Sequence, residues 1–239
     1  MALLSGSGGL GKTALTAGLA LQLAKSGKKV LCVDCQPGFG TLDIYLGMEQ
    51  LDNLSYADIC RGDYPLQRAA AHPKLPNLRF LSAPVRSDPG EISEVTFKAL
   101  TQQAKQQFDF IFFNTAAGLS PWALTAAEIA DRCTVLCGMD PISIRTAGRV
   151  ADQLQLLGKT DCRLVVSRVQ PAYLKAMKLT VDDLIDRVGL PLLGLVPEDE
   201  QVLLLSAAGT FPSGKKWAFA AYERISKRMQ GQPVPVPTR

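Results

Sequence analysis

A glycine-rich stretch near the start of the chain carries the residues best suited to chemistry. It reads Gly6-Ser7-Gly8-Gly9-Leu10-Gly11-Lys12-Thr13 and fits G-x-x-x-x-G-K-[ST], a loop whose backbone N–H groups surround phosphates. Glycine lets such a loop turn tightly and brings its amides close to a polyanion. We therefore expect a phosphate-binding site formed by Gly8, Gly9, Leu10, Gly11, Lys12, Thr13 and Ala14.

Two side chains of this stretch have distinct expected roles. Lys12 is predicted to neutralise the β- and γ-phosphates of a nucleotide, and the hydroxyl of Thr13 is predicted to hold Mg²⁺. The stretch follows a short apolar segment, residues 2–4, and precedes residues 14–25, which are typical of a helix. The positive end of that helix would face the same anion. A plain glycine-rich turn is the alternative, but this context favours phosphate binding.

The elements that must position the loop alternate along the chain. Apolar runs predict strands at residues 29–34, 78–83, 108–113, 133–137, 163–167 and 192–196, and helical patterns cover residues 90–107, 123–130, 144–157, 180–188 and 215–229. This alternation predicts an α/β fold with a mostly parallel twisted sheet and helices on both faces. Ligands on such sheets bind beyond the carboxyl ends of the strands, where the glycine-rich loop would lie.

The composition fits one globular domain. A chain of 239 residues, about half of them apolar, can build one sizeable core. We expect a single nucleotide-binding domain over residues 1–230 and an extended proline-rich tail at residues 231–239. The last helical segment, residues 215–229, is expected to pack on the sheet, and a helix on a membrane surface is the alternative.

Charge and hydropathy narrow the function classes. The net charge of +4 does not favour nucleic acid as the main ligand. No apolar run approaches the roughly 18 residues of a membrane-spanning helix, and the early glycine-rich loop leaves no room for a signal peptide. These features predict a cytoplasmic location.

The six cysteines and the single histidine are expected to be structural. Cys32 and Cys35 form C-x-x-C, which suggests a redox or metal site. A strand over residues 29–34, however, places residues three apart on opposite faces. Buried, reduced thiols are therefore the preferred interpretation. His72 lies in a polar loop without a candidate partner, so we expect it to be solvated.

Further segments follow the loop in a characteristic order. They are VDCQPGFGTLD at residues 33–43, NLSYADI at 53–59, FDFI at 108–111 and LGLVPED at 193–199. Together with residues 5–13, they resemble the MinD/ParA family of deviant P-loop ATPases, and MinD more closely than ParA. The resemblance covers nearly the whole chain.

The resemblance implies a set of properties. Family members bind ATP or ADP with Mg²⁺, form ATP-dependent homodimers face to face across the nucleotides, and hydrolyse ATP when a regulatory protein partner stimulates them. MinD proteins also attach to membranes through a C-terminal amphipathic helix, and ParA proteins bind DNA. The ends of two expected strands join the predicted nucleotide contacts: Ser167, Arg168, Pro197 and Asp199.

Three departures from the family pattern affect the chemistry. Ser7 stands where the family has a signature lysine that reaches the phosphates of the partner subunit. Gln36 replaces the second aspartate of Asp-x-Asp; it can orient a water but cannot accept a proton as a carboxylate does. Asn114 replaces the aspartate that ends the fourth strand, so a negative charge near the metal is lost. Gly118 remains, and its backbone N–H is expected to sense a γ-phosphate.

These departures give several hypotheses. The first is a MinD-like nucleotide switch with Lys12, Gln36 and Asn114 at the catalytic positions and slow or absent hydrolysis, acting in division-site placement or another intracellular positioning process. Alternatively, basic residues such as Arg86, Arg145 or Arg168 substitute for the lost groups. The remaining hypotheses are a scaffold without enzyme activity, an iron–sulfur carrier and a ParA-like DNA-binding ATPase.

The sequence gives less support to an iron–sulfur carrier and to a DNA-binding ATPase. No cysteine comes directly after the Asn114–Gly118 segment, where iron–sulfur relatives carry one. DNA binding would depend on the basic cluster of residues 215–228, and neither membrane docking nor DNA binding is favoured by the sequence. The cluster consists of Lys215, Lys216, Arg224, Lys227 and Arg228.

Overall fold

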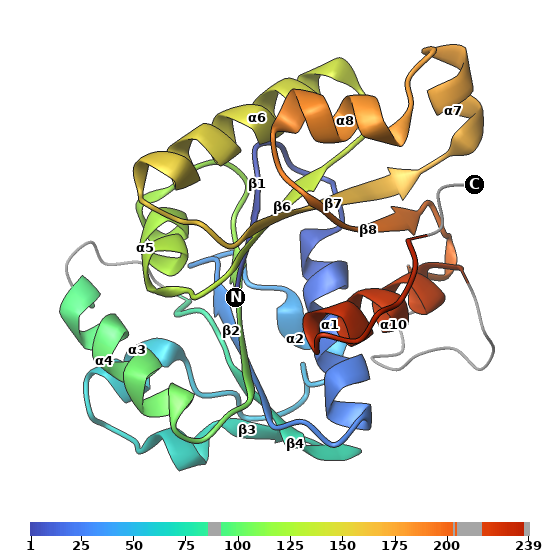
Figure 1. The fold of residues 1–239 in the computed structure, drawn as a ribbon. Helices are drawn as coiled ribbons and strands as arrows, with labels where there is room; N and C mark the ends of the chain where they lie inside the picture. The colour runs from blue at the N-terminus through green and yellow to red at the C-terminus, as the bar shows by residue number, and fades with distance from the viewer. Residues whose placement is uncertain (86–91, 203, 205–216, 237–239) are drawn as a thin grey trace.

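The computed structural model describes residues 1–85, 92–202, 204 and 217–236. Its described part contains an eight-stranded sheet with the order β3-β4-β2-β5-β1-β6-β7-β8 (Figure 1). All neighbouring strands are parallel except β3 and β4, which are antiparallel. The strands are β1 Ala2–Ser5, β2 Val30–Cys35, β3 Ala70–His72, β4 Leu75–Leu81, β5 Phe110–Thr115, β6 Cys133–Cys137, β7 Cys162–Val169 and β8 Leu192–Pro197. The predicted α/β fold with a mostly parallel sheet is confirmed.

Helices cover both faces of the sheet (Figure 1). The described α-helices are α1 Lys12–Lys25, α2 Leu42–Leu46, α3 Tyr56–Cys60, α4 Glu94–Lys105, α5 Pro121–Ile129, α6 Pro141–Leu156, α7 Pro171–Ala176, α8 Val181–Val188 and α10 Trp217–Met229. One apolar core lies between the sheet and α1, α2 and α10. The other lies between the sheet and α3, α4, α5, α6 and α8. The helix expected at residues 215–229 therefore packs on the sheet from residue 217 onward, and residues 215 and 216 lie outside the described residues.

The central strands place alternate side chains in the two cores. Cys32 lies in the core beneath α1, whereas Cys35 lies in the opposite core. All six cysteines are free, and all but the half-buried Cys60 are buried. Burial raises the pKa of the Cys60 and Cys137 thiols to about 11. The prediction of buried thiols on opposite faces of β2 is confirmed.

The expectation of a solvated His72 is wrong. His72 belongs to the short strand β3 and is only 4% exposed. Its Nδ1 accepts hydrogen bonds from the backbone N–H groups of Lys74 and Leu75, each at 3.1 Å. The imidazole thus closes the tight turn between β3 and β4. Polar neighbours suggested a loop because a strand of three residues has too few positions to show an alternating pattern.

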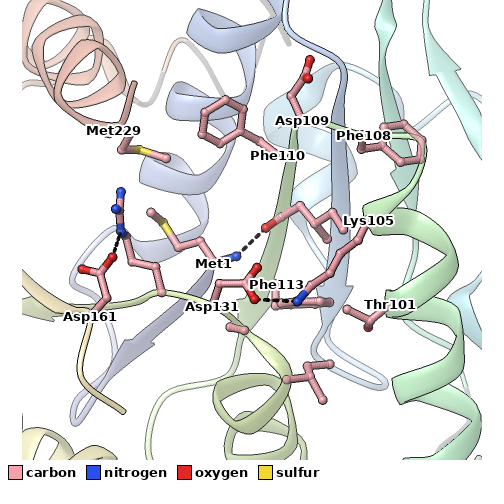
Figure 2. A pocket seen from close by; sticks show the side chains of 14 residues that line it. Met1, Thr101, Lys105, Phe108, Asp109, Phe110, Phe113, Asp131, Asp161 and Met229 are labelled. Atoms are coloured by element: carbon pink, nitrogen blue, oxygen red, sulfur yellow. Dashed lines mark hydrogen bonds and ion pairs between the residues drawn. The ribbon is translucent and has the colours of Figure 1, made fainter. Parts of the chain in front are cut away.

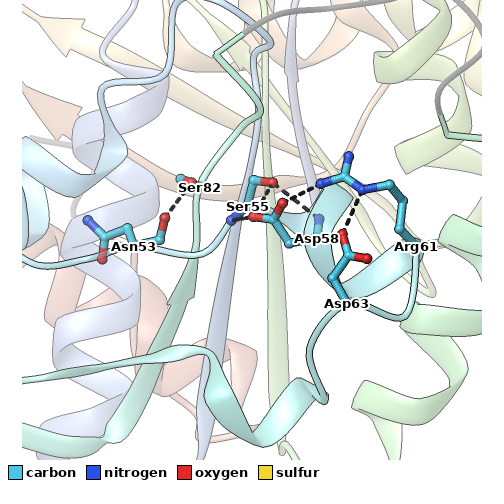
Figure 3. A network of polar contacts seen from close by, with 6 residues as sticks. All are labelled: Asn53, Ser55, Asp58, Arg61, Asp63 and Ser82. Carbon is cyan, nitrogen blue, oxygen red and sulfur yellow. Dashed lines mark hydrogen bonds and ion pairs between the residues drawn. The ribbon is translucent and has the colours of Figure 1, made fainter.

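A polar network holds the segment between α2 and β3 against the sheet. Ser55 and Asp58 form a capping box at the start of α3, and Arg61 forms ion pairs with Asp58 and Asp63 (Figure 3). The hydroxyl of Ser82, just beyond β4, donates to the carbonyl oxygen of Asn53 at 3.3 Å. The network fixes the chain beside the carboxyl end of β4.

Candidate nucleotide-binding site

The glycine-rich loop joins the carboxyl end of β1 to α1. Gly6 lies so close to α6 that an added Cβ would be 2.4 Å from the Cβ of Thr146. Gly9 and Gly11 each have φ near +74°, a conformation that favours glycine. Gly11 is the N-cap of α1 and offers no side-chain acceptor to the first-turn amides. The N-terminus of α1 is therefore open to an anion.

Lys12 lies buried beside this loop. The residue is 9% exposed, and its ammonium group donates to the hydroxyl of Ser5 at 2.6 Å. Among the described residues, no carboxylate forms a salt bridge with it. Burial lowers its pKa to about 8. A buried cation without a counter-ion costs free energy, and a bound polyphosphate would supply the missing negative charge.

Two residues from the end of β7 hold the loop in place. The hydroxyl of Ser167 donates to the carbonyl oxygen of Leu10 at 2.6 Å. Arg168 donates from Nη1 to the carbonyl oxygen of Gly9 at 3.2 Å and from Nε to Glu198 at 2.6 Å. Both residues were predicted to contact a nucleotide, and the structure brings them to the loop. Their hydrogen bonds occupy the carbonyl oxygens of Leu10 and Gly9 and so fix this part of the loop.

The end of β8 lies next to the end of β7. Val169 and Pro197 are paired in the sheet. The carboxylate of Asp199 accepts from the backbone N–H groups of Gln201 at 2.9 Å and of Ala218 at 3.1 Å. Asp199 thus ties the end of β8 to the start of α10. The predicted nucleotide contacts Pro197 and Asp199 therefore lie at the same edge of the sheet as the loop.

Asn114 and Asp34 form the polar floor of the site. Each is the second-to-last residue of a central strand, and both are buried. Asn114 Nδ2 donates to Asp34 Oδ1 at 3.2 Å and to Thr13 Oγ1 at 3.4 Å, and Thr16 Oγ1 is 3.3 Å from Asn114 Oδ1. Asp34 Oδ2 accepts from the backbone N–H groups at the start of α2, Thr41 and Leu42, each at 3.0 Å. The predicted positions Thr13 and Asn114 therefore meet.

Burial raises the pKa of Asp34 to about 6. The backbone N–H of Leu42, the Asn114 amide and the N–H of Thr41 act in the opposite direction, because hydrogen bonds to the carboxylate favour its charged form. Sequence reasoning gave no role to Asp34, Ser5 or Thr16. Asp34 was visible as the first aspartate of the switch segment, whereas Ser5 and Thr16 lie outside the loop motif and carry no spacing signal.

The other predicted positions have different surroundings. Gln36 is half-buried just after β2, and Ser7 is half-buried in the loop, where its carbonyl oxygen accepts from Ser5 Oγ at 2.8 Å.

The backbone N–H of Gly118 donates to the carbonyl oxygen of Ser5 at 2.8 Å. That N–H is thus already engaged, unlike the free group expected. Arg145 is exposed on α6, and Arg86 lies outside the described residues.

One cavity lies at the edge of the sheet opposite the loop, and another lies beside the site. One of about 450 Å³ is at the amino ends of β1 and β5, opposite the loop, and is flanked by the Lys105–Asp131 and Arg132–Asp161 ion pairs (Figure 2). The other, of about 390 Å³, lies at the carboxyl ends of β2 and β4 and includes Asp34 in its wall. The second cavity therefore adjoins the floor of the site.

The parallel sheet, the glycine-rich loop and the buried lysine define the class of P-loop nucleotide-binding proteins. A family model described as the CobQ/CobB/MinD/ParA nucleotide binding domain matches residues 1–212. The chain belongs to this family of nucleotide-binding domains and is a MinD-like member of its ATPases.

Relatives and solved structures agree with this assignment. The putative septum site-determining protein MinD of Emiliania huxleyi is 33% identical over 207 residues, which cover 86% of this chain and 76% of the relative. MinD of Thermotoga maritima is 31% identical over 238 residues, covering 97% and 88%. The structure of the MinC:MinD cell division protein complex of Aquifex aeolicus has a TM-score of 0.90, 27% identity and coverage of 98% and 96%.

A more distant structure shares the fold. MinD of Pyrococcus horikoshii, solved as a complex with Mg-ADP, has a TM-score of 0.80 at 22% identity and covers 95% of this chain and 94% of its own. In this chain, no helix within the described residues is both long and apolar enough to cross a membrane.

Proposed function

We propose that this chain is a MinD-like nucleotide switch that binds ATP or ADP together with Mg²⁺ and hydrolyses ATP slowly or not at all. One observation carries the proposal: the Lys12 ammonium is buried between the glycine-rich loop and β1, and within the described part of the chain its hydrogen-bond partner is the Ser5 hydroxyl alone. The open N-terminus of α1 lies beside it. Both groups favour a bound polyphosphate, and the Thr13 hydroxyl lies in the first turn of the same helix.

The argument for slow turnover rests on three side chains. Ser7 carries no charge to offer to the phosphates of a second subunit, Gln36 has no carboxylate to accept a proton, and Asn114 adds no negative charge beside Asp34. Removal of a single charge-stabilising group typically costs about two to three orders of magnitude in rate. The three losses affect one unit and are not expected to add.

Calorimetric titration with ATP and Mg²⁺ tests nucleotide binding. We expect binding well below millimolar concentration and its loss in Lys12→Ala. Lys25→Ala is the matched control, because it removes the same charge at the other end of α1, and it should bind as the native chain does. Absence of binding by the native chain near 1 mM ATP would overturn the proposal. A dissociation constant of about 1 mM corresponds to a binding free energy of about −4 kcal/mol.

Dimerisation, a protein partner and a role in division-site placement extend this proposal. Family resemblance supports an ATP-dependent homodimer. The Aquifex relative was solved in complex with MinC, and several relatives are named septum site-determining proteins. We therefore propose that the nucleotide state of this chain is read by a protein partner in positioning the division site.

A scaffold without enzyme activity is the second candidate function. It is favoured by the side chain of Asn114, which bonds inward to Asp34 and the threonines of α1. A steady-state assay of phosphate release distinguishes the two functions. Turnover at rates typical of ATPases, with or without a partner, would exclude the scaffold.

A further inference from the structure

The side chain of Asn114 connects three polar groups beneath the glycine-rich loop. Asn114 is fully buried at the end of β5. Its Nδ2 lies 3.2 Å from Asp34 Oδ1 and 3.4 Å from Thr13 Oγ1, while its Oδ1 lies 3.3 Å from Thr16 Oγ1. The amide is thus the link between β2 and the first turn of α1.

The orientation of this amide follows from its neighbours. An ionised carboxylate only accepts hydrogen bonds, so the nitrogen of Asn114 must face Asp34. The oxygen then faces the Thr16 hydroxyl at 3.3 Å, which also donates to the carbonyl oxygen of Lys12 at 2.9 Å. Because the same nitrogen also faces Thr13, the Thr13 oxygen receives an N–H and its own proton is not used by Asn114.

A carboxylate at position 114 would have the opposite effect. It would accept the proton of the Thr13 hydroxyl and leave the oxygen lone pairs directed outward, as a cation requires. The amide instead occupies a lone pair and leaves the O–H group free to donate. Thr13 belongs to the first turn of α1, so its free proton lies beside amides that attract an anion.

The charges around the loop also favour phosphate binding without a metal ion. The Lys12 ammonium has no carboxylate counter-ion among the described residues, and Asn114 adds no negative charge next to Asp34. A polyphosphate without a metal ion is therefore repelled by one carboxylate here, whereas a site with two aspartates would repel it with two. Mg²⁺ is correspondingly less needed to offset repulsion between the phosphates and the floor of the site.

We propose that Asn114 is a positioning residue that makes the Thr13 hydroxyl a hydrogen-bond donor to phosphate, so that this site binds nucleoside triphosphate almost independently of Mg²⁺. The inference rests on the proposed function, since it concerns how the same loop holds its nucleotide. It departs from the expectation that Thr13 acts chiefly as a metal ligand.

The first experiment compares ATP binding by the full chain in Mg²⁺ and in EDTA, using calorimetry. The native affinity should fall less than about tenfold in EDTA, that is by less than about 1.4 kcal/mol, whereas a site that needs Mg²⁺ to hold the phosphates should lose more. Thr13→Ala should weaken binding by the same factor in both buffers, because it removes a donor to phosphate. Thr13→Ser retains the hydroxyl and should restore the native affinity in both.

The second experiment changes the amide to a carboxylate. Asn114→Asp should make ATP binding depend on Mg²⁺, raising the ratio of the dissociation constants in EDTA and Mg²⁺ at least about tenfold. Gln67→Glu adds the same charge at an exposed position away from the loop and should leave the ratio unchanged. If Asn114→Asp does not fold, the native chain and the Thr13 variants still decide the question.

The outcomes separate this inference from the proposed function. Binding that requires Mg²⁺, with a Thr13→Ala defect seen only when Mg²⁺ is present, would overturn the role of Asn114 and leave the nucleotide switch intact. Absence of ATP binding in both buffers would overturn the switch itself. Equal defects of Thr13→Ala in the two buffers support the inference.

Discussion

Lys12 is the residue whose surroundings most directly suggest a ligand. Its ammonium is buried against Ser5, and the cost of that burial appears as a pKa lowered to about 8. A bound phosphate would favour the charged form and raise the pKa again. Ligand binding and protonation of one side chain are therefore linked.

This linkage predicts a pH dependence of nucleotide affinity. Below pH 8 Lys12 is already charged, so affinity should vary little between pH 7 and pH 8. Above pH 8 the free site must take up a proton on binding, and affinity should fall by up to about tenfold per pH unit. Calorimetry of ATP binding in buffers of different ionisation enthalpy measures the proton uptake. Constant affinity up to pH 9.5 would contradict the assigned surroundings of Lys12.

The three replaced family positions predict a gain of activity. The combined variant Ser7→Lys, Gln36→Asp and Asn114→Asp should hydrolyse ATP at least about tenfold faster than the native chain, because it restores a charge, a proton acceptor and a carboxylate near the metal. Phosphate release at saturating ATP is the measurement. Adding Lys12→Ala should abolish the gain, and an unchanged rate would indicate that other residues limit turnover.

At the scale of elements, α1 and α10 approach each other closely at Gly18. Gly18 in α1 faces Tyr222 in α10, and a Cβ at Gly18 would lie 2.3 Å from the ring. The two helices pack together over the same face of the sheet. The contact joins the helix that follows the loop to the last described helix.

Gly18→Ala should therefore destabilise the protein by about 2 kcal/mol, since the added methyl forces the ring or the helix to move. Gly148→Ala is the matched control, as Gly148 also lies within a helix, α6, but its added Cβ would be 3.5 Å from the Arg187 carbonyl oxygen. It should be neutral or stabilise the fold by up to about 1 kcal/mol. Denaturant unfolding measures both changes, and equal effects would argue against the close packing of α1 on α10.

The longer elements were predictable because their patterns are long enough to read. The strand at residues 133–137 was placed with its observed bounds, and α1, α5 and α6 begin within three residues of expectation. The short elements α2, α3, β3 and α7 were missed, since three to six residues show little periodicity. The loop was readable from its glycines and lysine, whereas the Ser167 and Asp34 contacts depend on tertiary structure.

The sequence of the basic cluster near the C-terminus does not reveal which of its side chains are bound within the fold. Lys227 forms an ion pair with Glu223 at 2.6 Å, and Arg228 donates to the carbonyl oxygens of Leu193 and Val234, each at 2.7 Å. Lys215 and Lys216 lie outside the described residues. Arg228 is thus occupied within the fold, and this weakens the case for a DNA-binding patch.

At the scale of the whole molecule, apolar side chains are exposed near the nucleotide edge. Phe39 follows β2 and is 84% exposed, Val85 follows β4 and is 90% exposed, and Ile142 begins α6 and is 73% exposed. The carboxyl ends of parallel strands share one edge of a sheet. A face-to-face homodimer across the nucleotides would cover such side chains.

Phe39→Asp should therefore weaken the proposed ATP-dependent dimerisation by at least about tenfold, because it places a charge where apolar surface would be buried. ATP binding by the monomer should be retained. Leu156→Asp is the control, since Leu156 is equally exposed but ends α6 at the opposite edge of the sheet. Light scattering with and without ATP measures the oligomeric state, and identical behaviour of the two variants would exclude this face.

The two borders of the sheet limit how copies of the chain can associate. At one border, β3 has only three residues and contains an irregularity between Ala71 and His72. At the other, the guanidinium of Arg228 binds the carbonyl oxygen of Leu193 in β8 and holds the following tail nearby. A very short strand at one border and a side chain bound to the backbone of β8 at the other both disfavour strand addition and the aggregation that accompanies it.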